Sequence, residues 1–202
     1  MEVLVIVVVA GALLCLALVW LVQAKRKAGS ICCNCNLKQV GISFRLWEDD
    51  RQGKYPMQVS VTNGGAMELV AAGNVAACFR VMSNELSTPK ILLCPADTHR
   101  VWATNFSTLN NSNISYFIGV DAKETKPQMF LSGDDNFAIG GVPVASGLLA
   151  ISTNTPFSWT AARHKFFGNV GLADGSVQQL NTNALQQALQ QTGVATNRLA
   201  IP

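Results

Sequence analysis

The stretch 3–22, VLVIVVVAGALLCLALVWLV, decides the expected fold because it is an unbroken apolar run without a charge. A helix needs about 20 such residues to cross the hydrocarbon core of a bilayer. A cleaved signal peptide would carry basic residues before a shorter apolar core. Here Met1 and Glu2 precede the run, and the basic cluster Lys25–Lys27 follows it. The sequence therefore predicts a retained transmembrane segment over residues 1–24.

The helical pattern continues beyond this run through residues 25–52. Apolar or small residues recur there at the spacing of one helical face, with polar residues on the other face. The residues of the apolar face are Leu37, Val40, Gly41, Phe44 and Trp47. We therefore expect one long helix with a transmembrane half and an amphipathic half, the second packed against a domain.

Residues 53–202 are long enough to form one α+β globular domain with its own core. The sequence predicts strands at 114–122 (ISYFIGVDA) and 147–154 (GLLAISTN). A short helix is expected over 182–193, capped by Thr182 or Asn183. The expected fold class is α+β, a long N-terminal helix packed on a small antiparallel sheet.

The segment 166–180, FFGNVGLADGSVQQL, has the pattern of a β-hairpin closed by Asp174 and Gly175. Asp-Gly between alternating runs favours a two-residue type I′ turn, which needs positive φ at both positions. If residues 164–174 form one strand, His164 and Asp174 lie roughly 30 Å apart. The spacing therefore argues against a His–Asp catalytic pair, and His164 is expected to form a local hydrogen bond where the strand begins.

Composition narrows the function classes. The chain has 15 Lys and Arg against 12 Asp and Glu, and its only basic cluster is Lys25–Lys27. Nucleic-acid binding requires clustered positive charge on the domain, so no nucleic-acid partner is expected. The sequence also contains no nucleophile motif, phosphate loop or paired carboxylates at catalytic spacing. We therefore expect a protein that is not an enzyme.

Six cysteines leave the disulfide pattern open. Cys78 and Cys94 are the natural pair in a disulfide-permissive compartment, but Cys94 can also join one of Cys32, Cys33 or Cys35. The CCNC run at 32–35 is a weak zinc signal, because a zinc site needs two spaced pairs or a pair with histidine. SGDDNF at 132–137 offers Asp134, Asp135 and Asn136 as oxygen ligands for calcium, although a solvated turn explains the same composition.

Several motifs together resemble a known family. Glu2 opens the apolar helix, and CNLKQVGISFRLWEDDRQGKYP, LLCPAD and YFIGVDA follow in that order. His164 then stands nine residues before ADGSV. This order resembles the type II secretion pseudopilins and type IV pilin-like proteins with a prepilin-type N-terminus and a C-terminal His-x9-Asp-Gly signature. The resemblance covers residues 2–180.

The resemblance implies a pilin-like fold and a structural filament subunit. Its partners would be homologous pilin-like subunits, the bacterial inner membrane and the secretion assembly platform, with residues 53–202 in the periplasm. It gives Glu2 an assembly role through the amino terminus of a neighbouring subunit, and makes His164, Asp174 and Gly175 a signature hairpin. It also supports a calcium ligand set at Asp134, Asp135 and Asn136.

One departure from the family supports an alternative. In the family, glycine followed by phenylalanine or methionine marks a cleavage site, and the glutamate is the fifth residue after the cut. Here only Met1 precedes Glu2. The alternative is a monomeric, membrane-tethered binding domain that does not polymerise.

Overall fold

The structure is a computed structural model that describes the backbone of all 202 residues. It describes every side chain except those of residues 4, 8–10, 12 and 25–30. The basic cluster Lys25–Lys27 therefore lies outside the described side chains. The helices are α1 (Glu2–Asp49), η1 (Pro56–Gln58), η2 (Val61–Asn63), α2 (Met67–Ala71), α3 (Val75–Val81), α4 (Ser83–Leu86), η3 (Pro89–Leu92), η4 (Asn111–Asn113) and α5 (Thr182–Gln191). The strands are β1 (Tyr116–Gly119), β2 (Phe130–Asp134), β3 (Phe137–Ile139), β4 (Val142–Pro143), β5 (Gly147–Ser152), β6 (Phe157–Trp159), β7 (Phe167–Leu172), β8 (Val177–Asn181) and β9 (Thr196–Ile201).

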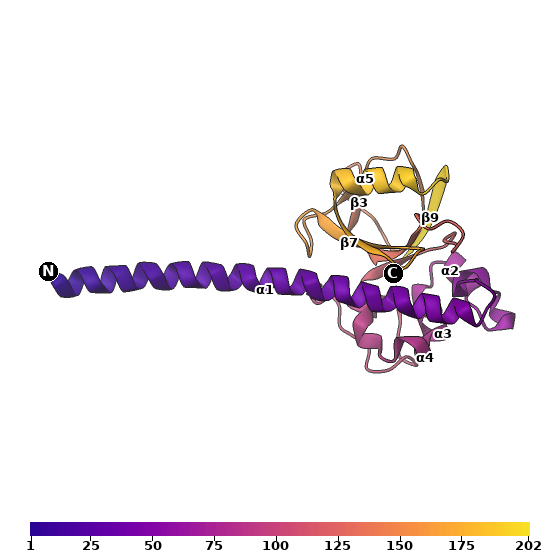
Figure 1. Ribbon diagram of the computed structural model, residues 1–202, viewed down its shortest axis with the longest axis horizontal. Coiled ribbons are helices and arrows are strands. Elements are labelled where there is room, and N and C mark those ends of the chain that lie inside the picture. The colour runs from indigo at the N-terminus through magenta and orange to yellow at the C-terminus, as the bar shows by residue number, and fades with distance from the viewer.

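Helix α1 has two environments. Its first half projects away from the rest of the chain, and its second half lies across the globular domain (Figure 1). The expected apolar face of this second half is confirmed, because one stripe of its side chains is buried. The stripe consists of Cys33, Leu37, Val40, Phe44 and Trp47.

The domain is built on two antiparallel sheets rather than one small sheet. The larger sheet has six strands in the order β5-β9-β1-β2-β7-β8, and the smaller has the order β4-β3-β6. The prediction of a pilin-like fold with a small sheet is therefore wrong: the described chain is rich in strands, with short helices beside the single helix α1. The number of strands expected from the sequence was too low because several strands are only three to five residues long.

The six-stranded sheet separates two hydrophobic cores. Successive side chains of a strand point to opposite faces of a sheet. In β1, Tyr116 and Ile118 join the core that contains α1, while Phe117 joins the core on the other face. The second core also contains Phe137 of the smaller sheet and Leu189 of α5. Both faces of the larger sheet are therefore covered, by α1 on one side and by α5 with the smaller sheet on the other.

The predicted membrane segment is also corrected. Among the helices formed by the described residues, none is long and apolar enough to cross a membrane. This finding overturns the transmembrane assignment of residues 1–24 and the expected single-pass location in the inner membrane with a periplasmic domain.

Local predictions had mixed outcomes. Strands β1 and β5 and helix α5 form where the sequence predicted them. The cap of α5 is Asn181, which accepts a hydrogen bond from Ala184, rather than Thr182 or Asn183. SGDDNF is not a solvated turn, because Asp134 ends β2, Phe137 begins β3 and both are buried.

Candidate functional site

The segment that leads into β7 has an unusual backbone. Arg163, Lys165 and Phe166 have φ values of 62°, 52° and 65°. Non-glycine residues rarely adopt positive φ, and several together indicate strain that the surrounding contacts must stabilise. The strained segment includes His164, whose backbone N–H donates to Ala162 O at 2.7 Å. This bend turns the imidazole into the domain before the strand begins.

His164 is almost fully buried, with 4% of its side chain exposed. Its Nε2 atom lies 3.3 Å from Cys94 Sγ and 3.6 Å from Asp134 Oδ2. Burial lowers the pKa of His164, and Arg163 adds to this effect, while the nearby Asp134 carboxylate opposes it. The local hydrogen bond of His164 is formed by its backbone N–H, whereas the side-chain contacts are to residues distant in the sequence. A catalytic triad does not fit, because both side-chain partners face the same ring nitrogen.

The disulfide joins Cys33 to Cys94, so the pairing of Cys94 with Cys78 is wrong. Cys78 is a buried free thiol in α3 whose pKa is raised by burial. Cys33 lies in the buried stripe of α1, and Cys94 follows η3. The bond therefore attaches α1 to the domain beside His164.

The three residues predicted to bind calcium form hydrogen bonds or ion pairs with other residues of the protein. Asp134 Oδ2 accepts from the backbone N–H of Asn169 at 2.7 Å and from its side-chain amide at 2.8 Å. Asp135 pairs with Arg100 and Arg163. Asn136 donates to Ala162 O at 3.1 Å. A calcium ion at this position would have to replace the arginine contacts, so the structure adds no support for the calcium prediction.

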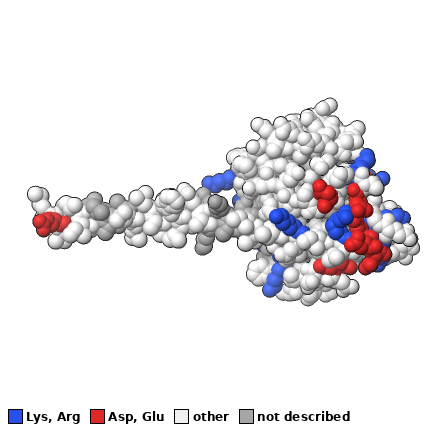
Figure 2. Space-filling view, viewed as in Figure 1, with Lys and Arg blue, Asp and Glu red and all other residues white. Residues whose placement is uncertain are grey.

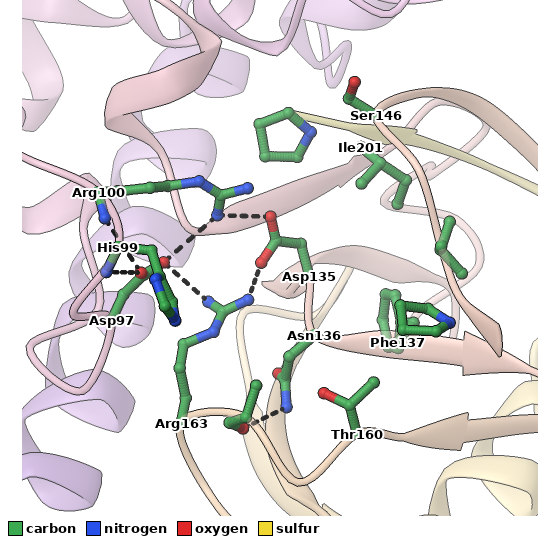
Figure 3. Close-up of a pocket in the computed structure, with 14 residues that line it drawn as sticks. Asp97, His99, Arg100, Asp135, Asn136, Phe137, Ser146, Thr160, Arg163 and Ile201 are labelled. Carbon is green, nitrogen blue, oxygen red and sulfur yellow. Dashed lines mark hydrogen bonds and ion pairs between the residues drawn. The ribbon is translucent and has the colours of Figure 1, made fainter. Parts of the chain in front are cut away.

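Two arginines and two aspartates form a network beside an open cleft of about 430 Å³ (Figure 3). Arg100 Nη1 lies 2.7 Å from Asp135 Oδ2, and Arg163 bridges Asp135 and Asp97. Burial alone would raise the pKa of Asp97, but the Ser115 hydroxyl and Arg163 hold it below its ordinary value. The Ser115 hydroxyl donates to Asp97 Oδ2 at 2.8 Å. The charges in this wall of the cleft are therefore neutralised within the protein.

The other end of the signature hairpin lies against α1. Asp174 Oδ1 accepts from the Ser176 N–H at 2.8 Å, and Gly175 N–H donates to Leu172 O at 2.9 Å. Gly175 has φ +84°, whereas Asp174 is not among the positive-φ residues. The turn is therefore a three-residue loop with glycine in the left-handed position, and the predicted type I′ turn is wrong.

The turn of the hairpin lies in van der Waals range of Gly41 on α1. A Cβ atom at Gly41 of α1 would lie 3.5 Å from the carbonyl oxygen of Gly175. Strand β7, with six residues and a length of about 20 Å, separates this contact from His164. His164 and Asp174 thus act at different ends of the hairpin, which agrees with the expectation that they are not a catalytic pair.

Glu2 lies in the first turn of α1 and is exposed. On the face shown in Figure 2, an acidic patch marks the tip of the helix, and the other described charges gather on and near the globular domain. No described residue of the domain forms an ion pair or hydrogen bond with the Glu2 side chain, so its expected assembly role depends on a second molecule.

No family model, curated protein or solved structure matches the chain. The resemblance to pilin-like proteins therefore stays a prediction from the motifs. Sequence reasoning left Cys33 as one of several possible partners of Cys94, and it missed Arg163 as the partner of three aspartates. The only available signal for Arg163 was its position next to His164, because its partners Asp97 and Asp135 are far away in the sequence.

Proposed function

We propose that this protein is a structural subunit that assembles with copies of itself into a filament through the projecting half of α1. The supporting observation is a shaft of apolar side chains that are each between 49% and 74% exposed. They are Val3, Val5, Ile6, Val7, Leu13, Leu14, Leu16, Leu18, Val19, Trp20, Leu21 and Val22. Contiguous apolar surface of this extent normally marks an interaction site.

The distribution of these side chains favours several neighbours rather than one. Leu14 and Leu16 are 63% and 58% exposed and lie about 200° apart around the helix axis. A single partner helix covers one stripe, whereas a helix that is apolar all round needs partners on every side. Packing among the helices of several copies supplies those partners, and the motif resemblance to filament subunits supports the same arrangement.

The assembly test compares one substitution at three exposed positions. Leu14→Asp and Leu16→Asp place a charge on opposite sides of the shaft, and Val142→Asp, at a residue 68% exposed in β4, is the matched control. Each full-length protein is diluted from mild detergent and followed by sedimentation velocity and negative-stain electron microscopy. We expect filaments of uniform diameter for the wild type and the control, and loss of filaments for both shaft variants.

The results distinguish ordered filament assembly from non-specific hydrophobic aggregation. Amorphous aggregates without a regular diameter, or a wild-type protein that stays monomeric at every concentration, would contradict the proposal. Loss of assembly in only one shaft variant would indicate a one-sided contact and would exclude a helix surrounded by copies.

Glu2 provides a separate test of the assembly contact. A carboxylate at the tip of an apolar helix is costly to bury unless it is paired. We propose that it pairs with the amino terminus of a neighbouring copy. Glu2→Ala should therefore lower co-assembly with wild-type chains in a crosslinking assay, while the thermal stability of the domain stays unchanged. Equal crosslinking yields for both proteins would contradict this role.

A further inference from the structure

The donor atoms beside the strained segment converge on one point. Cys33 Sγ, Cys94 Sγ and His164 Nε2 all lie within 4.8 Å of one another. Among the side chains that the structure describes, no other three His, Cys, Asp or Glu residues meet in this way. They come from α1, from the segment after η3 and from the segment before β7, so the fold rather than local sequence brings them together.

These separations suit a zinc ion once the sulfur–sulfur bond is opened. Zinc binds thiolate sulfur at about 2.3 Å and imidazole nitrogen at about 2.0–2.1 Å, so tetrahedral neighbours lie roughly 3.3–3.8 Å apart. The distance from Cys94 Sγ to His164 Nε2 is already 3.3 Å. The two sulfur atoms, which are bonded to each other in this structure, must move apart for both to bind one ion.

A buried carboxylate, Asp134, lies beside one of these three donors, His164. Asp134 Oδ2 is 3.6 Å from His164 Nε2, and the whole Asp134 side chain is buried. Its second oxygen, Oδ1, is buried and lies 3.9 Å from Arg163 Nη1, but it has no hydrogen-bond partner among the described residues. A buried carboxylate oxygen without a hydrogen bond is unfavourable, and a bound cation close to Asp134 would stabilise it.

We propose that Cys33, Cys94 and His164, with Asp134 in the fourth position, form a zinc site that is available when the disulfide is reduced. A dithiol reductant supplies two electrons and two protons, which convert the disulfide to two thiols while the dithiol becomes a disulfide. Zinc then displaces the two thiol protons and binds the two thiolates. No electron is transferred in the zinc-binding step.

The backbone around His164 is consistent with a ligand position. Arg163 and Lys165, on either side of it, both have positive φ. Strain of this kind persists where the surrounding structure requires one orientation of a side chain. In the oxidised protein the disulfide attaches α1 to the domain, and in the reduced protein the proposed zinc ion takes over this attachment. This inference is independent of filament assembly.

The test uses the full-length protein, oxidised or reduced with a phosphine, then incubated with zinc and desalted. Elemental analysis should find about one zinc ion per reduced chain and almost none in the oxidised chain. His164→Gln should weaken zinc binding by more than the roughly 10–100-fold that follows loss of an outer-shell partner. Affinity is measured by competition with a chromophoric chelator.

Two control variants identify the ligands. His99→Gln makes the same change at an exposed histidine, and Cys35→Ser removes an exposed thiol close to Cys33 in the helix. Both should bind zinc like the wild type. Cobalt in place of zinc should give a thiolate charge-transfer band in the reduced wild type, weaker or shifted in His164→Gln.

A second measurement covers the case in which a variant folds poorly. His164→Gln keeps the disulfide, so it is prepared in the oxidised state and checked by circular dichroism before reduction. Zinc should raise the Tm of the reduced wild type and leave that of reduced His164→Gln unchanged. The inference is overturned if the reduced wild type takes up no zinc, if the oxidised protein binds it equally, or if His164→Gln retains the wild-type affinity.

Discussion

Replacing Arg163 by methionine tests whether the buried ion network holds the domain together. The Arg163 side chain is 8% exposed, contacts Asp135 and lies 3.7 Å from Asp97 and 3.9 Å from Asp134. Its Nη1 also donates to Ser115 O at 3.1 Å. Removing one partner of a buried ion pair leaves an uncompensated charge and costs about 3–5 kcal/mol. We expect the free energy of unfolding of Arg163→Met to fall by about this amount.

The matched control is Arg198→Met. Arg198 pairs with Asp121 at the surface, where the two side chains are 45% and 32% exposed. Exposed ion pairs contribute about 0–1 kcal/mol, so the same substitution should have little effect there. Methionine has a Cβ atom like arginine, so the positive φ of residue 163 is equally unfavourable in the wild type and in Arg163→Met. The difference between the two variants therefore reports burial of the charge.

The measurement is denaturant unfolding of each full-length variant, followed by tryptophan fluorescence and circular dichroism in the same detergent. Arg163→Lys keeps the positive charge but lacks the planar guanidinium group. Its free energy of unfolding should therefore lie between those of the wild type and Arg163→Met. The reasoning is refuted if Arg163→Met is no less stable than Arg198→Met.

Three further predictions concern single positions. Gly175→Ala should lower the free energy of unfolding by about 1–2 kcal/mol, measured by thermal melting, because alanine is strained at φ +84°; an unchanged Tm would contradict this. Burial holds the pKa of His164 below its ordinary value of 6.5, so the folded state binds fewer protons than the unfolded state just below that pH. The oxidised wild type should therefore lose stability as the pH falls below 6.5, and the pH profile of Tm for oxidised His164→Gln should be flatter; parallel profiles would exclude His164 as the cause. Finally, iodoacetamide should modify the exposed Cys32 and Cys35 of the oxidised protein within minutes and leave Cys78 unmodified until denaturant is added, because Cys78 is fully buried and its pKa is raised; mass mapping that finds Cys78 labelled first would contradict the buried position.

Local periodicity explains the parts of the fold that the sequence predicted. The stripe from Leu37 to Trp47 is determined by spacing within one helix, so it was visible without any tertiary information. The same holds for β5 and for α5, each of which has a clear pattern and a clear end. The existence of the hairpin was also predictable, although Asp174 and Gly175 form a longer turn than expected.

Tertiary partners explain the parts that the sequence did not predict. Gly-Asp-Asp-Asn at 133–136 has the composition of an exposed turn. It is buried because Arg100, Arg163 and Asn169, from distant segments, pair with several of its polar groups. Nothing in the spacing of the carboxylates indicates these partners. The choice of Cys33 as the partner of Cys94 depends in the same way on where α1 crosses the sheet, which sequence spacing does not encode.

The signature hairpin fixes the position of α1 from both of its ends. At the entrance of β7, His164 lies against Cys94, which is bonded to Cys33 of α1. At the turn, the carbonyl of Gly175 lies close to Gly41, eight residues further along the same helix. Two attachment points on one helix determine its direction as well as its position. The direction in which the projecting half of α1 leaves the domain therefore depends in part on the hairpin, and the orientation of the domains in the proposed filament depends on residues far from the assembling surface.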